Sequence, residues 1–214
     1  MEVPFSRDQF LDVFAAYNVV LWPAAVALWA ATLAAVIQLV RGRAGSAGFA
    51  ALLALHWAWS GVAYHARFFS GINPAAWLFA ALFVAQAAAL AWTGVVRRRV
   101  RFDWHRSSRH ALAGVLLLFA LAYPGLALAT GHAWPRTPTF GVPCPTTLLT
   151  AGLLLAAVPP VPTWLVVIPV LWSIVGGSAA LLLGVVPDLM LFVAGAGLVV
   201  FAVAPGVLDR RRTP

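Results

Sequence analysis

The chain has 214 residues, of which 63% are hydrophobic and only 9% are charged, which excludes an ordinary soluble domain and indicates an integral membrane protein. All 14 basic residues are arginines, so no lysine is present to form the Schiff base of a retinal protein. The single cysteine excludes an internal disulfide and a Cys-x-x-Cys redox pair.

Residues 1–16 are predicted to form an amphipathic helix that lies at the membrane interface. Ser6 and Gln9 match a capping box, which predicts a helix that starts near Arg7. The segment lacks the basic region and cleavage site of a conventional signal peptide, so we expect the apolar segment that follows it to stay in the protein.

Seven apolar segments follow one another and predict an all-α bundle of transmembrane helices that forms one domain over residues 1–214. The segments cover about 17–40, 47–69, 73–96, 110–130, 144–158, 163–183 and 187–204. The fifth has roughly 15 residues and would rise about 22 Å, less than the ~30 Å hydrocarbon core. We therefore expect a short or re-entrant helix, and a short segment bounded by prolines points to the substrate site in transporters.

Polar residues recur on one face of the second segment, where His56, Ser60 and Tyr64 are four residues apart and Arg67 follows. Such a polar column should face protein or water and not hydrocarbon. The alternative is that the hydroxyl groups only bond to neighbouring carbonyls. The third segment begins with a helix-start signal at Asn73, which precedes a proline.

The distribution of arginine predicts the orientation of the bundle. With the N-terminus outside and the C-terminus in the cytoplasm, eleven of the 14 arginines fall on cytoplasmic segments. The Arg97–Arg109 loop is then a cytoplasmic surface for anionic lipid headgroups, and residues 131–143 form an outer loop. Because the arginines lie between apolar segments, the net charge of +8 indicates lipid and not nucleic acid as the partner.

The only cysteine, Cys144, lies between Pro143 and Pro145. Pro145 fits the first position of a helix, where its missing N–H costs nothing, and this places Cys144 at or next to the N-cap. A thiol at the positive end of the helix dipole gains thiolate character. The alternative is a small buried hydrophobic residue at a helix entry.

The predicted topology brings polar residues from distant segments to the outer ends of the helices. The candidates for a binding pocket there are Tyr17, Asn18, His65, Asn73, His132, Cys144, Thr146 and Thr147. Cys144, His65 and His132, together with Asp188, form a ligand set for a soft or borderline metal ion. Their spacing matches no metal-binding motif, and the alternative is an outer rim of helix caps and headgroup contacts.

Four stretches of the chain resemble a family of bacterial multi-pass membrane proteins known as the domain of unknown function 6064. They are Phe140-Gly-Val-Pro-Cys-Pro-Thr-Thr147, Val62-Ala-Tyr-His65, Ile72-Asn-Pro-Ala75 and Leu171-Trp-Ser-Ile-Val-Gly-Gly-Ser-Ala-Ala180. The resemblance implies a compact protein of the bacterial inner (plasma) membrane, with the first stretch as the family's signature. It implies no activity and no catalytic residue.

Three functions stay open at this point. The first is a transporter or channel for a small solute or a soft metal ion, with an outward-facing site at Cys144. The second is a membrane-embedded enzyme, in which Cys144 acts as nucleophile with His132 or His65 as base, or in which His and Asp hold a metal. The third is a non-catalytic subunit of a membrane complex, or a homo-oligomer, that docks through the small residues of Ser173–Ala180.

Overall fold

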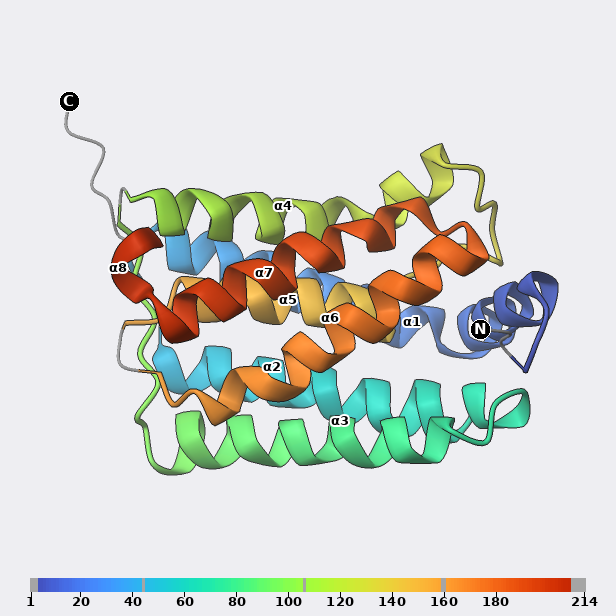
Figure 1. Cartoon of the computed structure of the whole chain (residues 1–214), viewed down its shortest axis with the longest axis horizontal. Helices are drawn as coiled ribbons and strands as arrows, with labels where there is room; N and C mark the ends of the chain where they lie inside the picture. The colour runs from blue at the N-terminus through green and yellow to red at the C-terminus, as the bar shows by residue number, and fades with distance from the viewer. Residues whose placement is uncertain (1–3, 44, 106, 159–160, 209–214) are drawn as a thin grey trace.

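The computed structural model describes residues 4–43, 45–105, 107–158 and 161–208, and within them the chain folds into a bundle of helices (Figure 1). The helices are α1 (Arg7–Val40), α2 (Ser46–Trp59), α3 (Ala76–Leu90), α4 (Ser108–Ala129), α5 (Pro143–Leu155), α6 (Trp164–Leu183), α7 (Met190–Val203) and α8 (Pro205–Leu208). Short turns extend them: the π-helical turns η1 (Ser60–Ala66) and η3 (Ala91–Val96), and the 3₁₀ turns η2 (Phe69–Gly71) and η4 (Val186–Leu189).

Six helices in the described part of the chain are long and apolar enough to cross a membrane, and α5 is a shorter apolar helix. The predicted all-α architecture is therefore confirmed, its long apolar helices are compatible with a membrane protein, and α5 lies at the place of the short fifth segment. The capping box is also confirmed, because the Ser6 hydroxyl accepts from the Gln9 amide and the Gln9 side chain accepts from the Ser6 amide.

Two predicted boundaries differ from the structure. The expected interfacial helix and the first span form one continuous helix of 34 residues, α1, which passes through Pro23 without a break. Helix α3 begins at Ala76 and not at Asn73, whose side-chain oxygen instead accepts a hydrogen bond from the Ala75 amide in the preceding turn. The turn at residues 159–160 and the arginine-rich tail at 209–212 lie outside the described residues.

Helix α5 is the centre of the bundle. It packs against α2, α4, α6 and α7, and every one of its 13 residues except Cys144 is buried. Close packing continues along its length, since a Cβ at Gly152 would lie 2.8 Å from the Leu117 side chain. A helix of 13 residues is only about 20 Å long, so both of its ends lie within the bundle and need partners there.

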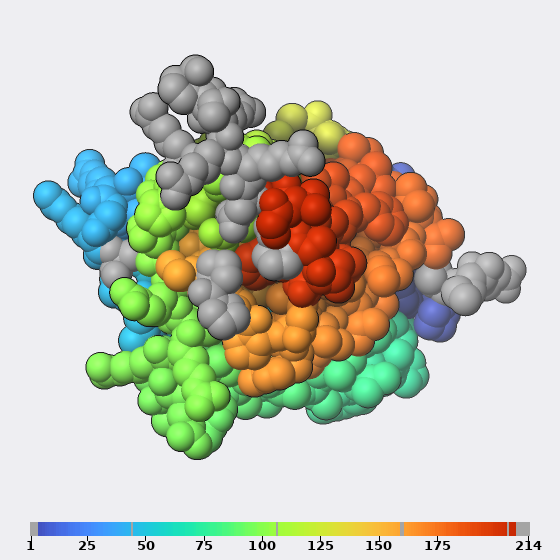
Figure 2. All heavy atoms as spheres, turned by 60° about the vertical axis from the view of Figure 1, so that its left-hand side comes forward, coloured from blue at the N-terminus to red at the C-terminus, as the bar shows by residue number. Residues whose placement is uncertain are grey.

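The end of the bundle that carries Arg41, Arg43 and the segment after α3 is called here the Arg-rich end. Figure 2 faces this end, where that segment (light green) projects from the surface. Its residues Arg97, Arg98 and Arg99 are exposed.

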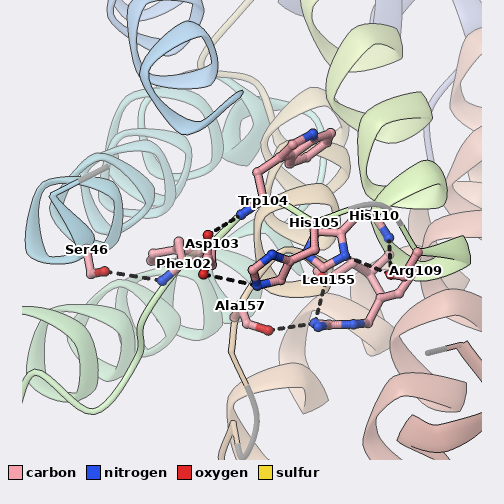
Figure 3. Close-up of polar contacts among 10 residues, drawn as sticks. Ser46, Phe102, Asp103, Trp104, His105, Arg109, His110, Leu155 and Ala157 are labelled. Atoms are coloured by element: carbon pink, nitrogen blue, oxygen red, sulfur yellow. Dashed lines mark hydrogen bonds and ion pairs between the residues drawn. The ribbon is translucent and has the colours of Figure 1, made fainter. Parts of the chain in front are cut away.

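Arg109, by contrast, is buried at the Arg-rich end and closes α5 (Figure 3). Its Nη1 atom donates to the carbonyl oxygens of Leu155 (2.7 Å) and Ala157 (2.6 Å). The Asp103 amide donates to the Ala156 carbonyl at 3.1 Å. The loop predicted to contact lipid headgroups therefore also supplies the partners that the last carbonyls of a short buried helix require.

Candidate functional site

A cavity of about 460 Å³ lies at the opposite end of the bundle, called here the Cys144 end. The start of α1, the η1 and η2 turns, α6, η4 and the first residues of α5 surround it. Its wall is mostly apolar, with aromatic rings from Phe5, Phe10, Phe14, Phe69 and Phe79. This region is called here the Cys144 cavity.

The local sequence aims Cys144 into this cavity. Gly141 has a φ of +81°, and a Cβ there would lie 2.5 Å from the Tyr17 hydroxyl oxygen and 2.6 Å from Trp59 Cδ1. Only glycine therefore fits the turn into α5. Helix α5 then begins at Pro143, and Cys144 is its second residue and the only one that is not fully buried.

A carboxyl group and a phenol lie beside the thiol. Asp188, on η4, is 3% exposed, and the Tyr123 hydroxyl of α4 donates a hydrogen bond to its Oδ1 atom. The Cys144 thiol lines the same cavity as this carboxyl and the Trp172 indole. Three helical elements thus bring a thiol, a carboxyl and a phenol together on one wall of the cavity.

Other polar atoms at the cavity have no hydrogen-bond partner among the described residues. His65 is completely buried, and neither its Nδ1 nor its Nε2 atom makes a hydrogen bond; the same holds for Nε1 of Trp172. The two rings meet edge to face with centroids 5.0 Å apart. Buried polar atoms normally find partners, because leaving one unpaired costs about 1–3 kcal/mol.

Gly176 is the point at which α6 comes close to these groups. A Cβ at Gly176 would lie 2.7 Å from Leu191 Cδ1, 3.3 Å from Trp172 Nε1 and 3.5 Å from Cys144 Sγ, so the Leu191 side chain borders the same space. The indole N–H of Trp172, the thiol of Cys144 and the Cα atom of Gly176 therefore face one small volume. A ligand atom in that volume would reach both polar groups.

Several predicted pocket residues instead hold the loop between α4 and α5. The Asn18 side chain donates to the carbonyls of Pro135 (2.7 Å) and Thr137 (2.6 Å) and accepts from Thr139 (2.6 Å). The Tyr17 hydroxyl donates to the Phe140 carbonyl at 2.9 Å. Neither side chain lines the cavity, so both have a structural role.

The polar column of the second segment is buried within the protein, apart from its last member. His56 pairs with Thr32 at 2.9 Å, and the Ser60 hydroxyl donates to the Gly141 carbonyl at 2.7 Å. Tyr64 is 2% exposed and lines the cavity, whereas Arg67 is exposed. The column therefore positions the turn into α5 as well as one wall of the cavity.

The remaining threonines and the backbone of His132 also have structural partners, while the Nε2 atom of His132 is buried without a partner among the described residues. Thr146 lies 3.1 Å from the Ser60 hydroxyl, and Thr147 donates to the Pro143 carbonyl at 3.0 Å. His132 lies in the loop after α4, where the Thr137 hydroxyl donates to its carbonyl. Burial lowers the pKa of His132 from its ordinary value.

The predicted metal ligands are only partly brought together. Cys144, His65 and Asp188 line one cavity with Asn73, but His132 does not. Among the described residues, no three His, Cys, Asp or Glu side chains are grouped closely enough to hold a metal ion. The structure therefore gives these residues a common cavity without assembling a metal centre.

Three residues of the site were missed from the sequence: Tyr123, Trp172 and Gly176. A signal existed for Tyr123, because a phenol within an apolar segment needs a hydrogen-bond partner. Trp172 and Gly176 look like ordinary packing residues until the rotation of α6 is known. Their contribution comes from the packing of α6 against α5 and not from a motif.

Comparison with known proteins gives one match. No curated protein and no solved structure matches the chain. A family model, described as a family of unknown function (DUF6064), matches residues 7–211, which is nearly the whole chain. The chain belongs to the family of unknown function DUF6064.

Proposed function

We propose that this protein binds a small molecule in the Cys144 cavity and that binding serves transport across the bacterial inner membrane. The observation that carries the proposal is the fully buried imidazole of His65, which has no partner and lies in the same cavity as Cys144, Asp188 and the unpaired Trp172 N–H. A mostly apolar cavity with a few convergent polar groups is the usual form of a small-molecule site.

Arginine placement supports an orientation in which the cavity faces outward. The exposed Arg97, Arg98 and Arg99 would then contact anionic lipid on the cytoplasmic side.

Irregular helices support transport over a static binding role. His65 and Tyr64 belong to the π-helical turn η1, and α4 and α6 contain Pro124 and Pro169. Such points are where helices bend and where functional motion concentrates. Three elements that form the cavity thus contain a deformable point, as alternating access requires.

Reaction of the only cysteine with N-ethylmaleimide tests the binding cavity. In the folded protein in lipid nanodiscs, we expect Cys144 to react and the Gly176→Ala variant to react more slowly, because the added methyl lies against the thiol. Gly177→Ala is the matched control on the same helix, since a Cβ there also comes close to a side chain, that of Phe192 at 2.8 Å, while a Cβ at Gly176 comes close to Leu191 as well as to the thiol. A thiol that reacts only after unfolding in detergent would reject the cavity.

The sidedness of labelling tests transport. A charged, membrane-impermeant maleimide should label Cys144 rapidly in right-side-out vesicles and slowly in inside-out vesicles, because a transporter opens its site to each side in turn. Labelling in right-side-out vesicles alone would reject transport and leave binding. Labelling in inside-out vesicles alone would reject the outward orientation, and no labelling from either side would reject transport of a water-soluble molecule.

The presence of Cys144 and Asp188 in one cavity favours one second candidate, a thiol enzyme. In acyl transfer, the thiol sulfur would attack an ester carbonyl, the ester C–O bond would break, and the thiol proton would pass through Asp188 or His65 to the departing alcohol. Incubation with p-nitrophenyl acetate would then leave an acetyl group on Cys144 and release p-nitrophenol in equal amount. Absence of the adduct at a thiol that N-ethylmaleimide labels would reject this candidate.

A further inference from the structure

The rim of the Cys144 cavity includes residues on the outer face of α6. Ile174, Val175 and Leu182 line the cavity and are 55%, 42% and 57% exposed. In a membrane-spanning helix, such exposed aliphatic side chains face hydrocarbon. The cavity therefore opens sideways, between α6 and the start of α1, toward the interior of the bilayer.

The polar wall selects against charged ligands. No arginine is among the described residues that line the cavity, and Asp188 is the only acid there. An anionic headgroup would meet this carboxyl without a counter-charge, which is costly in an apolar setting. A cation would pair with the Asp188 carboxyl but would leave the indole N–H of Trp172, which only donates, without an acceptor.

The unpaired atoms instead match an uncharged carbonyl. The Trp172 N–H needs an acceptor, and a neutral imidazole at His65 offers one donor and one acceptor. The hydroxyl of Tyr123 is already committed to Asp188. A carbonyl oxygen near Gly176 would take the indole proton and lie beside the Cys144 thiol.

We propose that the ligand of the Cys144 cavity is an uncharged amphiphile that carries a carbonyl head and enters sideways from the bilayer. Its head lies between Trp172, His65 and Cys144, its first carbons lie against the phenylalanines, and its apolar tail leaves over Val175 and Ile174. This inference rests on the proposed function in so far as both require the cavity. The carbonyl belongs either to a quinone ring or to an acyl ester, which share this chemistry.

Protection of Cys144 from N-ethylmaleimide tests the ligand class. The probes are a benzoquinone with a decyl tail and three ring methyl groups, which leave no free ring carbon for addition of the thiol, dioleoylglycerol and, as the anionic control, oleate at a pH above its pKa, each added to the protein in nanodiscs. We expect a neutral probe to slow labelling and oleate to have no effect. Protection by the quinone alone or by the acylglycerol alone identifies the source of the carbonyl. Equal protection by oleate, or no protection by either neutral probe, overturns the proposal.

Substitutions on α6 test the sideways entry. Val175→Trp and Ile174→Trp should obstruct the opening and slow the onset of protection, whereas Leu171→Trp should not, since Leu171 is 49% exposed on the same helix but does not line the cavity. Trp172→Phe should weaken protection about 2- to 10-fold, the range expected for one lost hydrogen bond. Equal onset in the Val175, Ile174 and Leu171 variants overturns the entry route.

The two proposals fail in different ways. If N-ethylmaleimide reaches Cys144 and Gly176→Ala slows it, the cavity stands even when neither amphiphile protects. If the reagent never reaches Cys144 in the folded protein, both proposals fall.

Discussion

The two ends of α5 solve the same physical problem in opposite ways. A helix of 13 residues inside the bundle leaves unpaired backbone groups at both ends, away from water. At the Arg-rich end the protein supplies hydrogen-bond donors, since Arg109 and the loop after α3 donate to the last carbonyls. At the Cys144 end, Pro143 and Pro145 remove two N–H donors, and the second residue of the helix faces a cavity.

This difference distinguishes the charged Arg109, which stabilises the fold, from the polar groups of the Cys144 cavity, which we propose bind a ligand. The buried Arg109 donates to two backbone carbonyls at hydrogen-bonding distance, as expected for a group that stabilises the fold. The polar groups of the cavity are instead incompletely paired, with both ring nitrogens of His65 and the indole nitrogen of Trp172 unbonded among the described residues. Incomplete pairing at the Cys144 end supports the proposed binding site, while the Nδ1 atom of His56 and the Nε2 atom of His132 are also unpaired outside the cavity.

The largest expected effect is at the closed end. Arg109→Ala removes two charged hydrogen bonds to buried carbonyls and should lower the free energy of unfolding by about 3 kcal/mol. The measurement is denaturant-induced unfolding in detergent, with Arg99→Ala as the exposed control. Equal stability of the two variants would show that the α5 carbonyls do not depend on Arg109.

The next effect concerns the turn that aims Cys144. Gly141→Ala combines a positive φ with a clash against Tyr17 and Trp59, and we expect a loss of about 2–3 kcal/mol. Gly131→Ala is matched, because Gly131 has a φ of +93° but a Cβ there meets nothing within 4 Å. Thermal unfolding should show a clearly smaller loss for Gly131→Ala, and equal losses would rule out the clash.

A smaller effect is expected within the cavity wall. Tyr123→Phe removes the hydroxyl that donates to Asp188 and should cost about 1–2 kcal/mol of stability. Tyr64→Phe deletes the same group from the same cavity, but the Tyr64 hydroxyl makes no hydrogen bond to the described residues. If Tyr64→Phe destabilised the protein as much as Tyr123→Phe in the same unfolding assay, the contact with Asp188 would not be the cause.

The smallest effect is a pH dependence from His132. Burial lowers the pKa of His132 in the folded protein, so the unfolded chain binds the proton more readily. Its stabilising contribution is complete above the unfolded pKa of about 6.5 and declines as the pH falls below it. Melting temperatures at pH 7.5 and 5 should therefore differ more in the wild type than in His132→Gln. An unchanged difference would assign the pH dependence to other groups.

Much of the fold follows from sequence because it depends on local signals. Apolar length predicts the spans, and the hydroxyl of Ser6 starts α1 as its capping box indicates. The short fifth helix follows from the prolines around it. The continuity of α1 across residues 16 and 17 could not be predicted, because whether an amphipathic segment continues straight into the next span depends on how both pack against the other helices.

The site was predictable only where topology decides it. Cys144, His65 and Asp188 line one cavity because all three lie near helix ends on the same side of the bundle. The roles of Asn18 and Arg109 were not accessible, because they depend on the path of a loop and on the depth at which α5 ends. The long-range contacts of these two side chains exist only in the folded chain.

The most direct test compares the two ends of α5 in one experiment. The rate of N-ethylmaleimide labelling would be measured at Cys144 in the wild type and at Ala157→Cys in a Cys144→Ala background, both in nanodiscs. Cys144 should react in the folded protein, whereas the cysteine at the buried position 157 should react only after unfolding. Rapid labelling at position 157 with a protected Cys144 would contradict the assignment of the open end.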